Sequence, residues 1–218
     1  MMCRARRRIT TTSFGILMTF SGRAAIRRVV LGAVITSLAA GIASAQSAQK
    51  VSLQLSVLGT SIGTGSGGSA SGIGLEPQLR FNHLARSESM GTLSLGVGGQ
   101  WTTHSSGDDE LTISGLFLEP RWVPPVSLAE GRLFPYLAAR LAWLNQSNNF
   151  GSSSGGTAFG GGGGFAFVLS PRINLDIGGA IVSQSFDDFK YSDDGSTGSF
   201  RTFTSYAIKA GLSYGLGK

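Results

Sequence analysis

A histidine and a serine two residues apart are the clearest candidates for catalysis in this chain. They belong to the run His104-Ser105-Ser106, and a serine with a histidine base beside it can attack an ester. Gly107 and the acidic residues 108–110 follow directly, so the run lies in a short polar segment. A solvated loop explains this composition equally well. We therefore assign neither His104 nor Ser106 as a catalytic residue.

Metal and thiol chemistry lack the side chains that they require. The only cysteine is Cys3 and the chain has 2 histidines, which excludes a cysteine zinc site, a disulfide framework and a thiol nucleophile from the remainder. Acidic residues cluster at 108–110, 187–188 and 193–194. They could collect divalent cations, but their spacing fits no calcium-loop template, and acidic loop residues are more often simply solvated. We expect no bound metal and no cofactor.

The excess positive charge belongs to the N-terminal part of the chain. The formal net charge is +6, yet seven basic residues and no acidic residue precede Gln46. The remainder holds 11 basic and 12 acidic residues, so the sequence does not predict a nucleic-acid partner. Charged residues make up only 14% of the chain, against about 25% in ordinary soluble domains. The chain is therefore short of the charge with which soluble domains cover their surface.

Residues 1–45 have the parts of a secretory leader. Three arginines precede the apolar run Val29–Ala40, and the small-residue pattern Ala43-Ser44-Ala45 follows it. This order is typical of a signal peptide cleaved after Ala45, whereas a membrane-spanning helix needs about 20 apolar residues. Met18 is a possible alternative start. We expect export and one mature domain of residues 46–218.

Beyond the leader, apolar and polar residues alternate with a period of two. This pattern predicts β-strands, because successive side chains of a strand point to opposite faces. No segment of the mature part shows a convincing helical period, so the sequence predicts an all-β domain. The eight expected strands are Val51–Leu58, Ile73–His83, Thr92–Thr103, Leu111–Trp122, Leu133–Leu144, Ala158–Leu169, Arg172–Ser185 and Arg201–Leu216.

Long and short connections between these strands alternate strictly along the chain. If the strands run up and down, all long connections lie at one end, and the short ones lie at the other end with both termini. An even number of strands with long outer loops and short periplasmic turns is typical of a bacterial outer-membrane barrel. The long connections are 59–72, 104–110, 145–157 and 186–200, and the short ones are 84–91, 123–132 and 170–171.

One face of most expected strands is apolar, and the other is small and polar. In Ile73–His83, for example, the odd positions from 73 to 81 are apolar or proline, and the even positions include Glu76 and Arg80. A soluble barrel would turn the apolar face inward and would need a charged exterior, for which there are too few charges. We therefore expect lipid outside and a narrow polar lumen inside.

Three positions disturb this pattern. The apolar residues of Leu111–Trp122 change from odd to even positions along the segment, which predicts a bulge near Ser114-Gly115. Pro77 and Pro120 each lack the N–H that a strand ladder uses, and they too suggest bulges.

Aromatic residues lie near both ends of the apolar faces. Trp101 and Trp143 are near the long-loop ends, and Phe81, Trp122 and Tyr214 are near the short-turn ends. Two such belts are expected at the interfaces of a barrel in lipid.

The polar faces carry four basic and three acidic residues. An eight-stranded barrel is only wide enough for side chains to fill it, and charges inside must pair. We expect a salt-bridged plug, with a narrow solute path lined by Arg121 and Arg140 as the alternative; a wide porin would need about 16 strands. The seven residues are Glu76, Arg80, Glu119, Arg121, Arg140, Asp176 and Lys209.

The segments Pro135–Trp143 (PYLAARLAW) and Gly160–Ala180 (GGGGGFAFVLSPRINLDIGGA) are the most typical pieces of the barrel pattern. With them, residues 51–216 resemble the small eight-stranded outer-membrane barrels of the OmpA, OmpX and OmpW kind. The last expected strand has Lys209, Gly211, Tyr214 and Leu216 in the spacing by which barrel-assembly machinery recognises a final strand, although the chain ends in Gly-Lys instead of an aromatic residue.

The histidine-serine spacing also resembles that of the eight-stranded lipid A 3-O-deacylases. That family has asparagine where this chain has Gly107, which weakens the likeness. The sequence thus favours a non-enzymatic barrel of a Gram-negative outer membrane with periplasmic termini, in a structural or surface-interaction role. Its expected partners are membrane lipid, lipopolysaccharide and the assembly machinery. A deacylase-like esterase using His104 and Ser106, or a narrow solute path, are the alternatives.

Overall fold

The computed structural model describes residues 49–63, 69–106, 109–148, 153–190, 197–198 and 202–217. The expected leader, with Met18 and the Ala43-Ser44-Ala45 cleavage pattern, lies outside these residues. No helix within the described ranges is long and apolar enough to cross a membrane.

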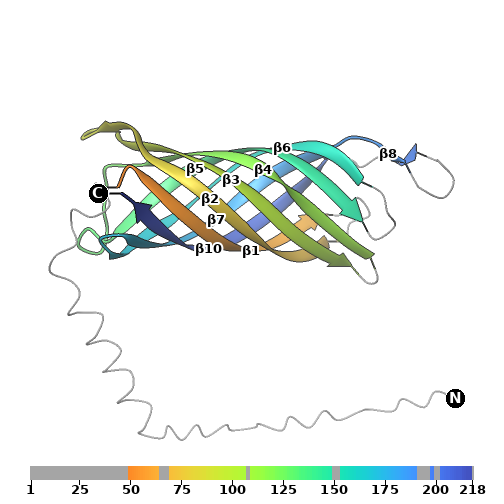
Figure 1. Cartoon of the computed structure of the whole chain (residues 1–218), viewed down its shortest axis with the longest axis horizontal. Helices are drawn as coiled ribbons and strands as arrows, with labels where there is room; N and C mark the ends of the chain where they lie inside the picture. The colour runs from red at the N-terminus through yellow and green to blue at the C-terminus, as the bar shows by residue number, and fades with distance from the viewer. Residues whose placement is uncertain are drawn as a thin grey trace, which may run out of the picture. The chain divides into compact units, whose positions relative to one another are not determined.

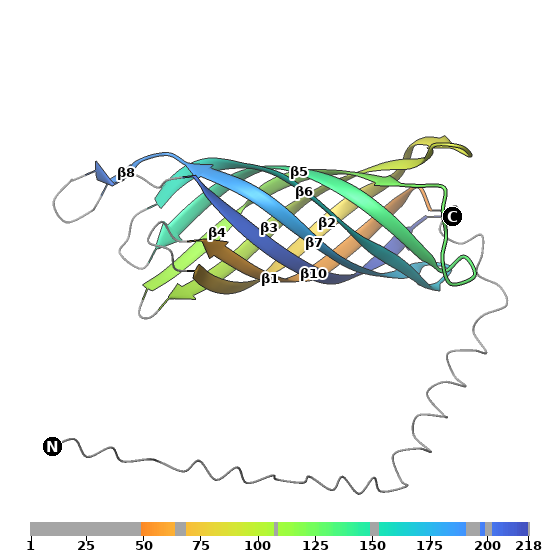
Figure 2. The same ribbon diagram turned by 180° about the vertical axis from the view of Figure 1, so that it is seen from behind.

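Eight long strands form a closed antiparallel barrel (Figures 1 and 2). Each strand pairs with its neighbours in the chain, and the last strand pairs with the first, so the all-β prediction of eight strands is confirmed. The strands are β1 (Val51–Gly63), β2 (Ser69–Ser87), β3 (Gly91–Ser106), β4 (Asp109–Val123), β5 (Leu133–Asn148), β6 (Ser153–Ser170), β7 (Ile173–Phe186) and β10 (Phe203–Leu216). The short strands β8 (Phe189–Lys190) and β9 (Thr197–Gly198) pair with each other between β7 and β10.

The two ends of the barrel differ in their connections. Strands β1, β3, β5 and β7 finish at one end, which we call the loop end, and residue 217 lies at the opposite end (Figure 1). There, residues 88–90, 124–132 and 171–172 join successive strands. We call this second end the turn end.

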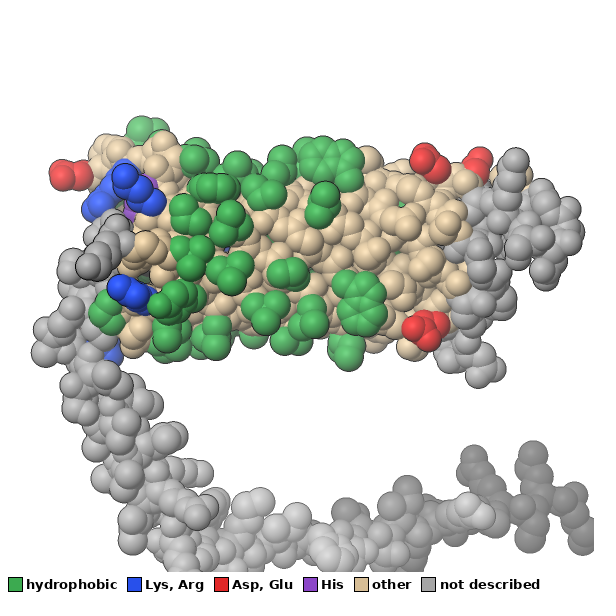
Figure 3. Space-filling model, in the orientation of Figure 1, with side chains coloured by type: hydrophobic (Ala, Val, Ile, Leu, Met, Phe, Trp, Pro, Cys, Tyr) green, Lys and Arg blue, Asp and Glu red, His purple; other side chains and the backbone are tan. Residues whose placement is uncertain are grey.

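The outer surface carries an apolar band that stops short of the loop end. Ile73 and Ile208 in this band are 73% and 72% exposed, whereas the inward neighbours Gln54 and Gln78 are 2% exposed. Figure 3 shows the hydrophobic side chains from the turn end across the middle of the barrel, followed by a surface without them. The faces therefore alternate as the sequence pattern predicts, with apolar side chains outside.

The strands continue past the apolar band into segments that the sequence assigns to loops. β2 starts at Ser69 and β6 at Ser153, and their pairing remains regular, as in Ser147↔Ser153. The predicted loops were too long because the outward residues in these extensions are small and polar and give no apolar signal. We use the name polar collar for the small, mostly polar outward residues at the loop-side ends of the eight strands, both in these extensions and next to them; they are Gly59, Ser61, Ser69, Ser71, Thr103, Ser105, Thr112, Ser114, Asn145, Ser147, Ser153, Thr157, Ser183, Ser185 and Thr204.

The predicted bulges in β2 and β4 were wrong. β4 pairs with β3 without a register shift, and its odd residues Ile113 and Phe117 point inward and are almost completely buried. The apolar pattern changes position because part of the lumen is itself apolar. Pro77 and Pro120 cause no shift either, since each stays paired with a residue of one neighbouring strand.

Tyr136 of β5 packs against glycines of β6 and β7 inside the lumen. A Cβ added at Gly178 would collide with the Tyr136 hydroxyl, and one added at Gly164 would lie 2.6 Å from it. The neighbouring Gly179 faces outward, where an added Cβ would meet only the Ala207 carbonyl at 3.4 Å. The glycines of β6 and β7 thus leave the room that the tyrosine ring needs.

We predict that Gly178→Ala destabilises the barrel by about 1–3 kcal/mol, because the new methyl group displaces the Tyr136 ring from its contacts with Asp176 and Arg121. Gly179→Ala is the matched control and should change the free energy of unfolding by less than half as much. Urea unfolding in lipid vesicles, followed by tryptophan fluorescence, measures both. Equal effects of the two substitutions would contradict the packing role of Tyr136.

Candidate functional site

The lumen contains a cluster of seven charged side chains near the middle of the strands. Each is at most 8% exposed, although the outer surface at this height is apolar. They come from five different strands, and the antiparallel register brings them together. The charged cluster consists of Glu76 and Arg80 of β2, Glu119 and Arg121 of β4, Arg140 of β5, Asp176 of β7 and Lys209 of β10.

Glu119 is the centre of this charged cluster. Its carboxylate lies 2.6 Å from Arg80 Nη2 and 2.8 Å from Lys209 Nζ. Arg121 Nη2 lies 3.2 Å away and Arg140 Nη1 lies 3.7 Å away. One carboxylate therefore faces all four cations of the cluster.

The other two carboxylates bind the outer sides of these cations. Glu76 lies 2.7 Å from Arg140 Nη1 and 3.5 Å from Lys209 Nζ. Asp176 lies 2.5 Å from Arg121 Nη1 and accepts a hydrogen bond of 2.9 Å from the Tyr136 hydroxyl. Every carboxylate of the charged cluster thus faces at least one cation, as charges in such an interior require.

Aromatic rings and an amide complete the surroundings of the arginines. The Arg121 guanidinium lies 3.7 Å from the centre of the Tyr136 ring, and that of Arg140 lies 3.9 Å from the centre of the Phe117 ring. Arg140 also donates to Gln100 Oε1 at 2.8 Å. The sequence analysis missed Tyr136 and Phe117. Their positions could have placed them in the lumen, because Tyr136 lies on the same face of β5 as Arg140, and Phe117 lies on the same face of β4 as Glu119.

An apolar layer packs inside the lumen on the loop side of the charged cluster, next to buried polar side chains such as His104 and Gln184. Phe186 stacks on Phe203 with ring centres 5.8 Å apart, and the layer packs between β4, β5, β6 and β7. Its buried members are Ile113, Phe117, Ala142, Leu144, Ala158, Val182 and Phe186.

A cavity of about 600 Å³ occupies the lumen on the turn side of the charged cluster. Arg80, Arg121, Tyr136 and Asp176 line it from the cluster, and residues of the three turns line its mouth. The lumen is therefore open at the turn end and is filled beyond it, first by the charged cluster and then by the apolar layer.

His104 lies inside the barrel and not in a loop as expected. It is a residue of β3, it is 2% exposed, and its Nε2 lies 2.8 Å from Thr60 Oγ1 of β1. The side chain of Ser106 lies outside the described residues. Within the described ranges, no group of three histidine, cysteine or acidic residues is placed to hold a metal ion.

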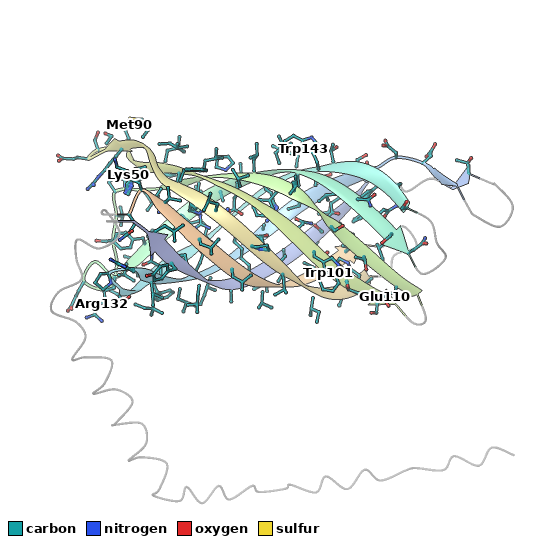
Figure 4. The ribbon with its side chains drawn as sticks, in the orientation of Figure 1. Lys50, Met90, Trp101, Glu110, Arg132 and Trp143 are labelled. Atoms are coloured by element: carbon teal, nitrogen blue, oxygen red, sulfur yellow. The ribbon has the colours of Figure 1, made fainter. Side chains whose placement is uncertain are left out.

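The five aromatic residues assigned to the interfaces all face outward. Trp101 and Trp143, each 51% exposed, lie on the loop side of the apolar band (Figure 4). Phe81, Trp122 and Tyr214 are exposed nearer the turn end, where Trp122 Nε1 donates to the Met90 carbonyl at 2.7 Å. In the last strand, Lys209 and Gly211 face the lumen, and Tyr214 and Leu216 face outward.

Comparison with known proteins shows the fold. No protein-family model and no curated protein matches the chain. Among solved structures, Neisserial surface protein A superposes with a TM-score of 0.60 at 16% identity, over 77% of this chain and 97% of that protein. Ail, the attachment invasion locus protein of Yersinia pestis, gives a TM-score of 0.40 at 13% identity, over 76% of this chain and 99% of Ail. The fold is therefore that of the small eight-stranded outer-membrane barrels, and the resemblance noted in the sequence is confirmed.

We predict that Glu119→Gln lowers the free energy of unfolding by about 3–5 kcal/mol, because it leaves buried cations without their shared carboxylate. Glu130→Gln is the matched control: Glu130 is exposed in the turn between β4 and β5, and its substitution should change stability by no more than about 0.5 kcal/mol. Urea titration in vesicles measures the difference. Similar stability of the two variants would show that the cluster does not hold the barrel together.

Proposed function

We propose that this protein is a closed outer-membrane anchor that acts through its outer surface, without enzymatic activity and without conducting solutes. Its loop end faces the outside of a Gram-negative cell, and its turn end and both termini face the periplasm. Outer-membrane lipid and lipopolysaccharide surround it, and the barrel-assembly machinery recognises its last strand. The observation that carries this proposal is the filling of the lumen by the charged cluster and the apolar layer.

The outer surface supports a position in a membrane with the loops held above it. A transmembrane β-strand needs about 9–11 residues, and the strands here have 13 to 19. Part of the extra length is the polar collar, whose serine, threonine and asparagine side chains suit a hydrated layer above the apolar band. The collar raises the connections of the loop end away from the lipid, where they are available for contact with other molecules.

The two alternative functions find less support. A solute path along the lumen would have to cross Arg121 and Arg140, which are both held in ion pairs, and then the apolar layer. An esterase acting on membrane lipid needs its histidine on the lipid side or at the rim, but His104 points into the barrel and contacts Thr60. We therefore favour the closed anchor.

The orientation can be tested with two epitope insertions. A tag between Asp187 and Asp188 at the loop end should be labelled by antibody on intact cells, because this end is expected outside. A tag between Ala129 and Glu130 at the turn end should be labelled only after the outer membrane is permeabilised. The two insertions control for each other, and the opposite pattern would overturn the orientation.

A closed lumen should not conduct ions. The purified barrel should show no discrete conductance steps in planar lipid bilayers, since ion pairs and packed apolar side chains fill its centre. Steps whose size changes in an Arg121→Gln or Arg140→Gln variant would support the narrow solute path instead of the anchor.

A further inference from the structure

The charged cluster is not electrically neutral. It contains four cations, Arg80, Arg121, Arg140 and Lys209, and three carboxylates. These seven are all the charged side chains that are buried within the described residues. One positive charge is therefore left over in the interior of the barrel, where an unbalanced charge is strongly unfavourable.

The neighbouring groups do not remove this excess. Besides the cluster, the titratable or charged residues that line the cavity are His83, Arg86, Glu88 and Arg172. Arg86, Glu88 and Arg172 are exposed at the mouth, where cations again outnumber acids. Glu119 already serves four cations, and Asp176 is occupied by Arg121 and Tyr136. The missing negative charge has no source among the described side chains that face the cluster.

The cavity at the turn end gives an anion access to this charge. Its volume of about 600 Å³ is within the range of small-molecule sites, and Arg80 and Arg121 lie at its inner end. Guanidinium groups match the geometry of carboxylate and phosphate oxygens. The acids that line the cavity are Asp176, which is paired with Arg121, and Glu88, which is exposed at the mouth. The walls add neutral hydrogen-bonding side chains, namely Ser52, Gln54, Asn82, Ser94, Asn174 and Ser213.

We propose that this cavity binds one small oxyanion, a carboxylate or phosphate group, against Arg80 and Arg121. The bound anion brings the buried charges into balance and closes the inner end of the cavity. This site is separate from the surface role proposed above, and neither depends on the other.

The test is anion-dependent stability of the purified barrel in a mild detergent. The thermal midpoint of unfolding is followed by the shift in mobility between folded and unfolded bands on SDS gels. Sodium phosphate and sodium acetate are titrated separately against sodium chloride at matched ionic strength. We expect a saturable rise in midpoint with at least one of the two oxyanions, reaching a gain of about 100-fold in the folded-to-unfolded ratio at 100 times the dissociation constant. Equal stabilisation by all three salts would overturn the proposal.

Lys209→Met is the decisive variant, because it leaves three buried cations and three buried carboxylates without altering a residue that lines the cavity. It should lose the saturable oxyanion effect. Arg132→Gln is the matched control: it removes a cation at the turn end that belongs neither to the cluster nor to the cavity, and it should keep the effect. Retention of the effect in Lys209→Met would contradict the charge-balance argument.

A direct measurement covers the case in which Lys209→Met does not fold. Equilibrium dialysis of the unmodified barrel with radiolabelled phosphate, and competition by unlabelled acetate, should give one site per chain. Competition by acetate identifies a site for oxyanions in general, and its absence identifies one for phosphate. No bound phosphate together with no stabilisation by acetate would overturn the proposal.

Discussion

The pairing of β1 with β10 is the constraint on which the rest of the structure depends. Twelve residue pairs, from Val51↔Leu216 to Ile62↔Ser205, join the first strand to the last and leave no open edge. Backbone groups that face lipid must find partners within the protein, so a sheet can exist there only when it closes. Closure also fixes which residues of each strand point into the lumen, because a slip by one residue would turn the inward side chains of a strand to the outside. The burial of the charged cluster follows from this register.

Within the closed sheet, large side chains fit because small ones stand beside them. An eight-stranded barrel has room inside for little more than its own side chains. Space for the Phe117 ring is left by Gly98, and space for Gln78 and Arg80 is left by Gly96. In each case a Cβ at the glycine would overlap the larger side chain. Many of the 33 glycines therefore serve the lumen and not only the loops.

The period-two pattern was sufficient to predict the eight strands, the apolar outer face and which charged residues lie on inward positions. It could not predict the collar, because Ser69 or Ser153 in a strand looks like the same residue in a loop. It misassigned Ile113 and overlooked Phe117, because an apolar side chain inside a barrel gives the same signal as one facing lipid. Which charges meet, as Glu119 meets Lys209, depends on the register of distant strands. The cavity depends on the combined volumes of many side chains, and no local pattern reports it.

Lys209 links the charge of the lumen to the closure of the sheet. The first seven long strands carry three of the buried cations and all three buried carboxylates, so a sheet without β10 is balanced. The last strand brings the one charge in excess, and it brings that charge to Glu119, 90 residues earlier in the chain. The positive excess therefore exists inside the barrel only when β10 is paired with β1 and β7. A bound anion that offsets this charge would favour the closed barrel over the same sheet with β10 detached.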